Sequence, residues 1–231
     1  MKKFLGYLGI VVALVIASAG VASADQVFTT SPGAVNPLTG QSVSATADFS
    51  LSGNTLTLAL TNTTPNIVSI GQVLTGLSFT LSDSSGVSLT NQTGNLVNIL
   101  DGGVISPFGG STDALGWGFG STGGNTFDLC VICSGGVTSP VTPSEGLLGP
   151  TSADGKFDNA NASITGNDPH NPLVLGTATY TFTVPSNVTV SDVVFTFGTQ
   201  TGGNVSAPEP ASILLLGLGL AGLPLLKRRR S

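Results

Sequence analysis

Apolar and polar residues alternate strictly near both ends of the central part of the chain, and this pattern limits the fold more than any other feature. Residues 43–51 place Val, Ala, Ala, Phe and Leu at every second position, with Ser, Thr, Asp and Ser between them. This period of two is typical of a half-buried strand, whose side chains point to alternate faces. A second run, 56–60, follows Ser52, Gly53 and Asn54, so we predict a β-hairpin.

The same pattern returns later in the chain. Residues 177–184 alternate Thr with Ala, Tyr, Phe and Val, and residues 193–197 alternate again after Pro185, which cannot donate to a strand ladder. Shorter candidate strands lie at 77–81, 87–90, 96–100 and 115–119. Short strands separated by Gly, Asn, Ser and Pro predict an all-β fold with an antiparallel β-sandwich-like body. Residues 133–171 lack periodicity, and we predict a long loop region that covers one end of the body.

Charge is scarce in this chain. Charged residues make up 8% of the 231 residues, against roughly a quarter in ordinary soluble proteins. Hydroxyl and amide groups must therefore provide the hydrated surface. Residues 25–206 hold eleven carboxylates against the single Lys156, a net charge of −10. Such a body repels phosphate backbones, which argues against a nucleic-acid partner.

The N-terminus has the three-part layout of a secretory signal. Lys2 and Lys3 precede the apolar stretch 9–17, and the segment closes on the small residues Ala22 and Ala24 on either side of Ser23. We predict that residues 1–24 form a signal helix, and that signal peptidase cuts after Ala24 to leave Asp25 as the mature N-terminus. The alternative is an uncleaved membrane anchor.

The C-terminus carries a second membrane-directed segment. Pro208, Glu209 and Pro210 precede the apolar residues 211–226, and a basic cluster closes the chain: Lys227, Arg228, Arg229 and Arg230. As a helix the apolar run spans about 24 Å, somewhat less than a hydrocarbon core, and snorkelling arginines can supply the difference. The basic cluster should remain cytoplasmic. We therefore predict a transmembrane helix that holds the exported body at the inner membrane.

This order of motif, apolar span and terminal basic cluster resembles the PEP-CTERM sorting signal. The resemblance covers residues 207–231 and implies that a membrane protease of the exosortase type recognises the tag and cuts near Pro208-Glu209-Pro210. Pro224 departs from the family pattern, because it interrupts the apolar helix. The predicted organisation is a signal peptide at 1–24, a body at 25–206 and a sorting signal at 207–231. The alternative is a plain anchor that is never cleaved.

Few residues suggest chemistry. Cys130 and Cys133 are the only cysteines, too few for a four-ligand zinc site, and an exported protein meets oxidising conditions, so we predict a small disulfide loop. His170 and Asp168 share a turn without a Gly-x-Ser-x-Gly motif nearby. Glu145 is the only glutamate of the body and lies in a Pro-rich loop, where the buried acid of a glycosidase is not expected. We predict no catalytic residue and no cofactor.

A metal site is the remaining chemical alternative. Residues 154–161 and 167–168 are rich in oxygen ligands, but their spacing does not fit an EF-hand. We predict a solvated loop and no metal, with calcium binding as the alternative.

Two functions are consistent with these features. The first is an exported structural protein of the cell surface or extracellular matrix, associated with exopolysaccharide and biofilm. The alternative is a carbohydrate-binding module or adhesin. Sugar sites commonly use exposed aromatic rings, and Trp117, between Gly116 and Gly118, is either such a platform or a buried core residue.

Overall fold

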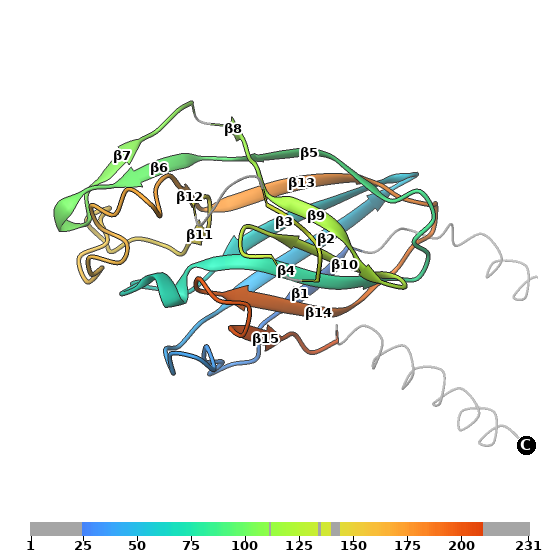
Figure 1. Cartoon of the computed structure of the whole chain (residues 1–231), viewed down its shortest axis with the longest axis horizontal. Coiled ribbons are helices and arrows are strands. Elements are labelled where there is room, and N and C mark those ends of the chain that lie inside the picture. The colour runs from blue at the N-terminus through green and yellow to red at the C-terminus, as the bar shows by residue number, and fades with distance from the viewer. Residues whose placement is uncertain (1–24, 111, 134, 140–143, 210–231) are drawn as a thin grey trace, which may run out of the picture.

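The computed structural model describes residues 25–110, 112–133, 135–139 and 144–209. In this part of the chain two sheets face each other, and the regular helices are two short 3₁₀ turns, η2 (Ile70–Gln72) and η3 (Asp101–Gly103) (Figure 1). The predicted all-β fold with antiparallel sheets is confirmed. The predicted signal helix and transmembrane helix lie outside the described residues, and no helix within them is long and apolar enough to cross a membrane.

One sheet has six strands in the order β1-β2-β3-β13-β5-β8. Their bounds are β1 (Gln26–Thr29), β2 (Ala45–Ser52), β3 (Thr55–Asn62), β13 (Thr177–Thr183), β5 (Ser88–Gly94) and β8 (Asp113–Ala114). Every neighbouring pair in this sheet is antiparallel.

The other sheet has nine strands. Its main path is β15-β14-β4-β11-β12-β6-β7, and β10 pairs with both β4 and β9. The bounds are β15 (Asn204–Ser206), β14 (Val190–Phe197), β4 (Leu74–Leu81), β11 (Leu147–Leu148), β12 (Leu173–Leu175), β6 (Leu96–Ile99), β7 (Ile105–Pro107), β10 (Thr126–Cys130) and β9 (Gly118–Gly123). Within this sheet β11 and β12 run parallel.

Most of the predicted strands are present. The predicted hairpin is β2 and β3, which pair without interruption from Ala45↔Asn62 to Ser52↔Thr55. The two later alternating runs are β13 and β14, and the shorter candidates at 77–81, 87–90 and 96–100 lie largely in β4, β5 and β6.

The strand predicted at 115–119 is wrong for its first half, because β9 begins at Gly118. A side-chain amide takes the place of a strand partner here. The Oε1 atom of Gln92 accepts a hydrogen bond from the Trp117 N–H at 3.0 Å, and its Nε2 donates to the Trp117 carbonyl at 3.2 Å. The apolar residues that suggested a strand are instead core residues on an irregular segment, with Trp117 2% exposed.

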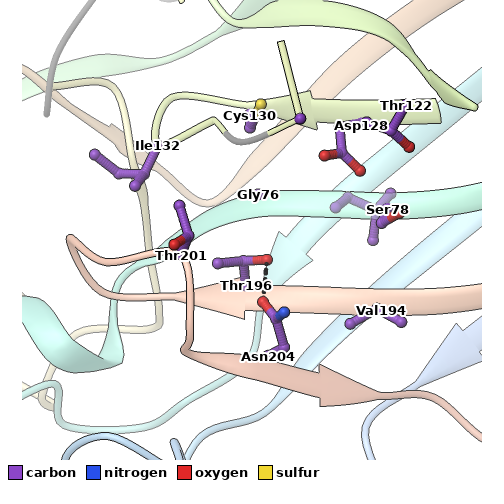
Figure 2. A pocket seen from close by; sticks show the side chains of 12 residues that line it. Gly76, Ser78, Thr122, Asp128, Cys130, Ile132, Val194, Thr196, Thr201 and Asn204 are labelled. Atoms are coloured by element: carbon purple, nitrogen blue, oxygen red, sulfur yellow. Dashed lines mark hydrogen bonds between the residues drawn. The ribbon is translucent and has the colours of Figure 1, made fainter. Parts of the chain in front are cut away.

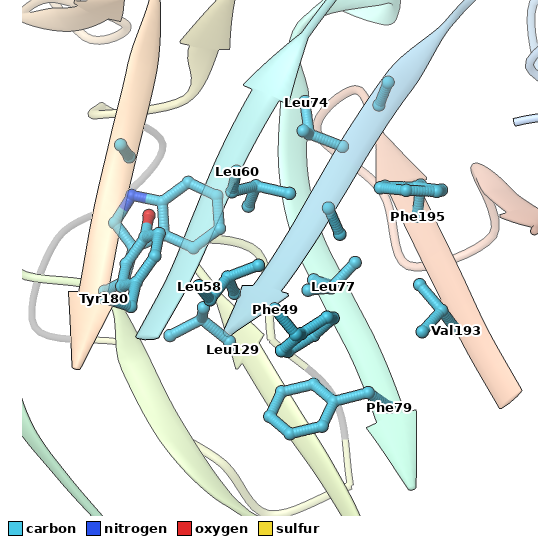
Figure 3. Packing of buried hydrophobic residues seen from close by; sticks show 14 of the residues in the cluster. Phe49, Leu58, Leu60, Leu74, Leu77, Phe79, Leu129, Tyr180, Val193 and Phe195 are labelled. Carbon is cyan, nitrogen blue, oxygen red and sulfur yellow. The ribbon is translucent and has the colours of Figure 1, made fainter. Parts of the chain in front are cut away.

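The main core fills the space between the sheets. The ring of Phe79 on β4 lies 5.3 Å from that of Phe49 on β2 and 5.9 Å from that of Phe182 on β13, between ring centroids. Figure 3 shows Phe79 and Leu77 facing Phe49 and Leu58 across the core. The apolar positions of the alternating sequence therefore lie on the inner face of each sheet, because every second side chain points into the core between the sheets.

The segment 133–171 is more than a cover. It is mostly irregular, as predicted, but β11 inserts into the nine-stranded sheet between β4 and β12. Phe157 and Ile164 are 1% and 0% exposed. They belong to a second apolar cluster with Ile67, Val73, Val97, Ile99, Leu148 and Leu173. The segment therefore contributes Leu148, Phe157 and Ile164 to a second core beside one end of the sandwich.

The outer face of the six-stranded sheet presents rows of hydroxyl groups. Thr46, Thr61 and Thr177 are opposite one another on three neighbouring strands, and the Oγ1 atoms of Thr61 and Thr177 are 2.7 Å apart. Further along the same strands Ser50, Thr57 and Thr181 form a second row. On this face uncharged hydroxyl groups supply hydrogen-bonding capacity in place of charged side chains.

Candidate sorting site at the edge of the nine-stranded sheet

The predicted sorting motif begins where the fold ends. The last strand, β15, pairs with β14 from Thr196↔Asn204 to Val194↔Ser206, and the N–H of Ala207 still donates to the carbonyl of Val193 at 2.8 Å. Pro208 has no N–H, so this ladder cannot continue. The hydrogen-bonded sheet therefore extends to Ala207, the residue that precedes the first proline of the motif.

Glu209 is exposed and contacts the body through its carboxylate. Its Oε1 accepts a hydrogen bond from the N–H of Asp192 at 3.2 Å. Asp192 has a left-handed backbone (φ +51°) and lies where the register of β14 against β4 shifts between Ser191 and Val194. A bulge of this kind leaves an N–H outside the ladder, and here that N–H is directed to Glu209.

The described part of the motif, Pro208 and Glu209, is exposed and non-helical. This is the form that a protease cleft can accept. Pro210 and the basic cluster (Lys227, Arg228, Arg229 and Arg230) lie outside the described residues, and so do Ala22 and Ala24 at the predicted signal peptidase site.

Comparison with known proteins agrees with this location. Residues 206–230 match the family described as the PEP-CTERM protein-sorting motif. No curated protein and no solved structure matches the chain. The fold and this match define an exported all-β protein with a C-terminal sorting tag. The chain is a PEP-CTERM sorting domain-containing protein, and its motif implies processing by exosortase, a membrane protease.

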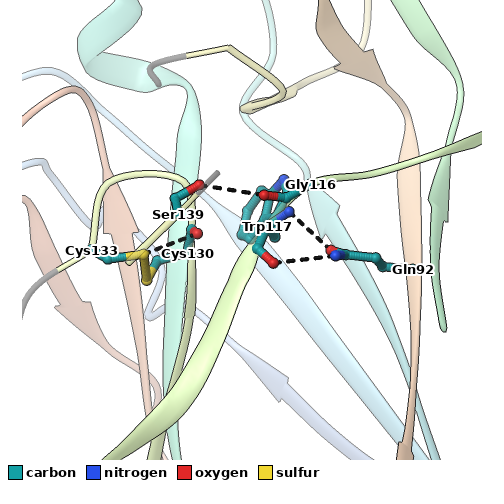
Figure 4. The surroundings of a disulfide bond; sticks show 6 residues. All are labelled: Gln92, Gly116, Trp117, Cys130, Cys133 and Ser139. Carbon is teal, nitrogen blue, oxygen red and sulfur yellow. Dashed lines mark hydrogen bonds between the residues drawn. A yellow bond between two sulfur atoms is a disulfide. The ribbon is translucent and has the colours of Figure 1, made fainter. Parts of the chain in front are cut away.

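The two cysteines close a short loop at the end of β10. The sulfur atoms of Cys130 and Cys133 are bonded, with 5.2 Å between the Cα atoms (Figure 4). Behind this loop the Ser139 hydroxyl donates to the carbonyl of Gly116 at 3.4 Å. In the pairing of β10 with β9, Cys130 stands opposite Gly118, so the disulfide loop lies beside the segment that carries Trp117.

Glu145 is a buried acid in the Pro-rich loop, where none was expected. Its side chain is buried, with 8% of the residue exposed, and its Oε2 accepts a hydrogen bond from the Gly116 N–H at 2.6 Å. Its own N–H donates to the carbonyl of Pro172 at 2.6 Å. Burial raises the pKa of this carboxyl, and the bond from Gly116 opposes that rise. Contacts from two segments distant in sequence, at Gly116 and Pro172, hold the residue in this buried position.

Trp117 is a core residue rather than a sugar platform. It is 2% exposed, and its ring centroid lies 5.4 Å from that of Tyr180. Its indole N–H is directed to the backbone of Glu145. Of the two roles considered for Trp117, the structure places it in the core.

His170 closes a turn. Its Nδ1 lies 2.6 Å from the carbonyl oxygen of Ser163, and because a carbonyl only accepts, Nδ1 carries the proton. Side chains of the oxygen-rich loop likewise interact with other residues of the same loop. The Asn161 Oδ1 accepts from both the N–H and the hydroxyl of Ser163, and Asp154 faces Lys156 at 3.6 Å. Among the described residues, no three His, Cys, Asp or Glu side chains group as metal ligands.

Proposed function

We propose that this protein is a structural component of the cell surface or extracellular matrix, associated with exopolysaccharide and biofilm. It is exported, held at the inner membrane as a tethered precursor, and then released or transferred after exosortase cuts the tag. The body acts by binding and filling space rather than by catalysis. This role extends the sorting assignment to the part of the chain that remains after processing.

The observation that carries the proposal is the direct passage from β15 into the motif. Ser206 is both the last residue of the last strand and the first residue of the motif match. A cut near Pro208-Glu209-Pro210 therefore removes only the tail and leaves every described strand in the product. The tail acts as a cleavable sorting signal, and the remaining body is a complete β-sandwich.

The surface of the body supports a structural role. One face of the sandwich presents neutral hydroxyl rows, and the described residues hold Lys156 as their sole lysine or arginine. Such a surface is hydrated by neutral hydroxyl groups and carries almost no positive charge, which suits a protein embedded in a glycan-rich layer.

Two variants test the sorting half of the proposal. Deleting residues 208–231 should release a folded body into the medium, because no described strand extends past Ser206. Glu209→Ala with the tail intact should leave uncut precursor in the inner membrane, since the apolar run still supplies retention. Asp168→Ala, which removes another exposed carboxylate, is the matched control and should mature normally.

Cell fractionation and mass measurement of the three variants give the readout. Normal maturation of the Glu209→Ala protein would show that the tail is a plain anchor, and the sorting-based role would then be abandoned. The matrix role has its own readout: the mature protein should co-purify with the extracellular polysaccharide layer, and recovery only from washed cells free of that layer would contradict it.

A further inference from the structure

A small groove crosses the outer face of the nine-stranded sheet, on the side away from the core. Its volume is about 280 Å³, and it lies over β4 between β10 and β14 (Figure 2). In the strand register Gly76 of β4 stands between Cys130 and Thr196, and Ser78 stands between Asp128 and Val194. Two rows of side chains therefore line the groove, with a gap at Gly76.

Gly76 forms the floor of this groove. A Cβ atom added there would lie 3.2 Å from the Cβ of Thr196 and 3.4 Å from the Cβ of Cys130. These approaches are tight, so any side chain at position 76 would fill the space between the neighbouring strands. The glycine thus keeps the groove open where the flanking residues are larger.

Two different elements build the walls. On one side stands the β14–β15 hairpin, where the Thr196 hydroxyl donates to the Oδ1 of Asn204 at 2.9 Å. This bond fixes the amide of Asn204 and leaves its Nδ2 group available as a donor. On the other side Ile132, within the loop that the Cys130–Cys133 disulfide closes, contributes an apolar wall.

Two polar side chains of the groove, Asp128 and Ser78, have no hydrogen-bond partner in the part of the chain that the structure describes. The Asp128 carboxylate is half-buried and makes no hydrogen bond with any described residue, and the same holds for the hydroxyl of Ser78. A half-buried carboxylate is a strong acceptor for hydroxyl donors. Together with the Nδ2 donor of Asn204, the groove offers both acceptors and donors beside the apolar side chains of Val194 and Ile132.

The charges narrow the ligand class. None of the described residues that line the groove is Lys or Arg, and Asp128 is the one carboxylate among them, so an anionic ligand is repelled. One carboxylate is also too few for calcium, which takes six to eight oxygen ligands. A neutral sugar ring fits, because its hydroxyl groups pair with Asp128 and Asn204 while its C–H face packs on the apolar wall. The volume lies just below the usual range of ligand pockets, which suits a single residue of a longer chain.

We propose that this groove binds a neutral sugar residue of an extracellular glycan through Asp128, Ser78 and Asn204, with the disulfide loop holding one wall. The inference deepens the proposed association with exopolysaccharide and rests on it. Sugar binding by the body and processing of the tag are measured separately, so each can fail without the other.

The test uses the mature protein and saturation-transfer difference NMR with three neutral probes: cellopentaose, mannopentaose and maltopentaose. Trigalacturonic acid serves as the anionic probe. We expect saturation of at least one neutral probe and none of trigalacturonic acid. Asp128→Asn should weaken binding about tenfold, as expected for the loss of a charge-assisted hydrogen bond, and Asn204→Ala should weaken it in the same direction. Both changes lie at the surface of a folded sheet, and unchanged urea midpoints will show that the fold is retained.

Asp158→Asn is the matched control, because Asp158 is an exposed carboxylate outside the groove. It should bind as the unaltered protein does. The proposal is overturned if no neutral probe is saturated, if trigalacturonic acid binds as well as the neutral probes, or if Asp158→Asn weakens binding as much as Asp128→Asn.

Discussion

The indole N–H of Trp117 donates a hydrogen bond to the backbone carbonyl of Glu145, 2.9 Å away. Glu145 in turn accepts from the N–H of Gly116 through its carboxylate. These two bonds attach the irregular segment after the disulfide loop to the main core, where Trp117 packs on Tyr180. The loop region is therefore fixed by a buried acid and an aromatic pair.

Replacing Glu145 tests the buried carboxyl. Its pKa is raised in the folded protein by burial, so the unfolded chain releases this proton at lower pH than the folded chain does. Ionisation of Glu145 therefore lowers the free energy of unfolding. The loss begins near the unfolded pKa, about 4.3, and is complete above the higher folded pKa. We expect the stability of Glu145→Gln relative to the unaltered protein to increase from pH 4 to about pH 7. Urea unfolding at both pH values measures this, and a difference independent of pH would contradict it.

Tyr180 carries a buried hydroxyl without a hydrogen-bond partner among the described residues. Burial, and secondarily the charge of Glu145, raise its pKa well above the ordinary value, so the phenol stays neutral. An unpaired buried hydroxyl destabilises the fold, and Tyr180→Phe should increase the free energy of unfolding by about 1 kcal/mol. Thr179→Val, on the outer face of the same strand, should change it by less than about 0.5 kcal/mol. A destabilised Tyr180→Phe protein would show that the hydroxyl is paired.

Substitutions at two adjacent glycines distinguish the cost of backbone strain from the cost of a steric clash. Gly102 and Gly103 share a φ of +74°, but a Cβ on Gly102 would meet open space, whereas one on Gly103 would overlap the carbonyl oxygen of Phe157. Gly102→Ala should therefore cost about 1–2 kcal/mol, the ordinary penalty for a left-handed alanine. Gly103→Ala should cost clearly more, because η3 and the segment of Phe157 must move apart. Equal urea midpoints for the two variants would mean that this close approach is absent in solution.

The disulfide should contribute little to stability. Its loop is four residues long, and the loop-length relation predicts less than the roughly 3 kcal/mol of a 15-residue loop. We expect Cys130→Ser with Cys133→Ser to unfold at nearly the same urea concentration as the unaltered protein. Alkylation of the denatured, unreduced, exported protein should label no thiol. Two labelled thiols would show that the bond does not form after export.

The long strands were predictable because one face of each is buried and the other is hydrated. β2, β3 and β13 alternate over seven or eight residues, and this period survives in the sequence. β11 was not predictable, since Leu147 and Leu148 are both fully buried and two residues carry no period. The second core was missed for a related reason: Phe157 and Ile164 are isolated apolar residues in a polar loop, and only the fold brings them together.

The two candidate sites differ in the same way. The sorting motif is contiguous, so Pro208, Glu209 and Pro210 are recognisable without a structure. The groove is assembled across strands: Gly76, Asp128 and Asn204 are far apart in the chain and meet through the pairing of β4 with β10 and β14, and of β14 with β15. No spacing rule in the sequence reports such a register.

β15 also determines what the processing cut leaves exposed. An uncovered edge strand presents free N–H and C=O groups, a template on which another chain can add a strand and begin to aggregate. Asn204, Val205 and Ser206 occupy that position on β14 opposite Thr196, Phe195 and Val194. A cut after Ser206 yields a product whose edge strand is the three-residue β15, a short template for another chain. A cut before Asn204 would turn the same protein into a seed for intermolecular sheet growth.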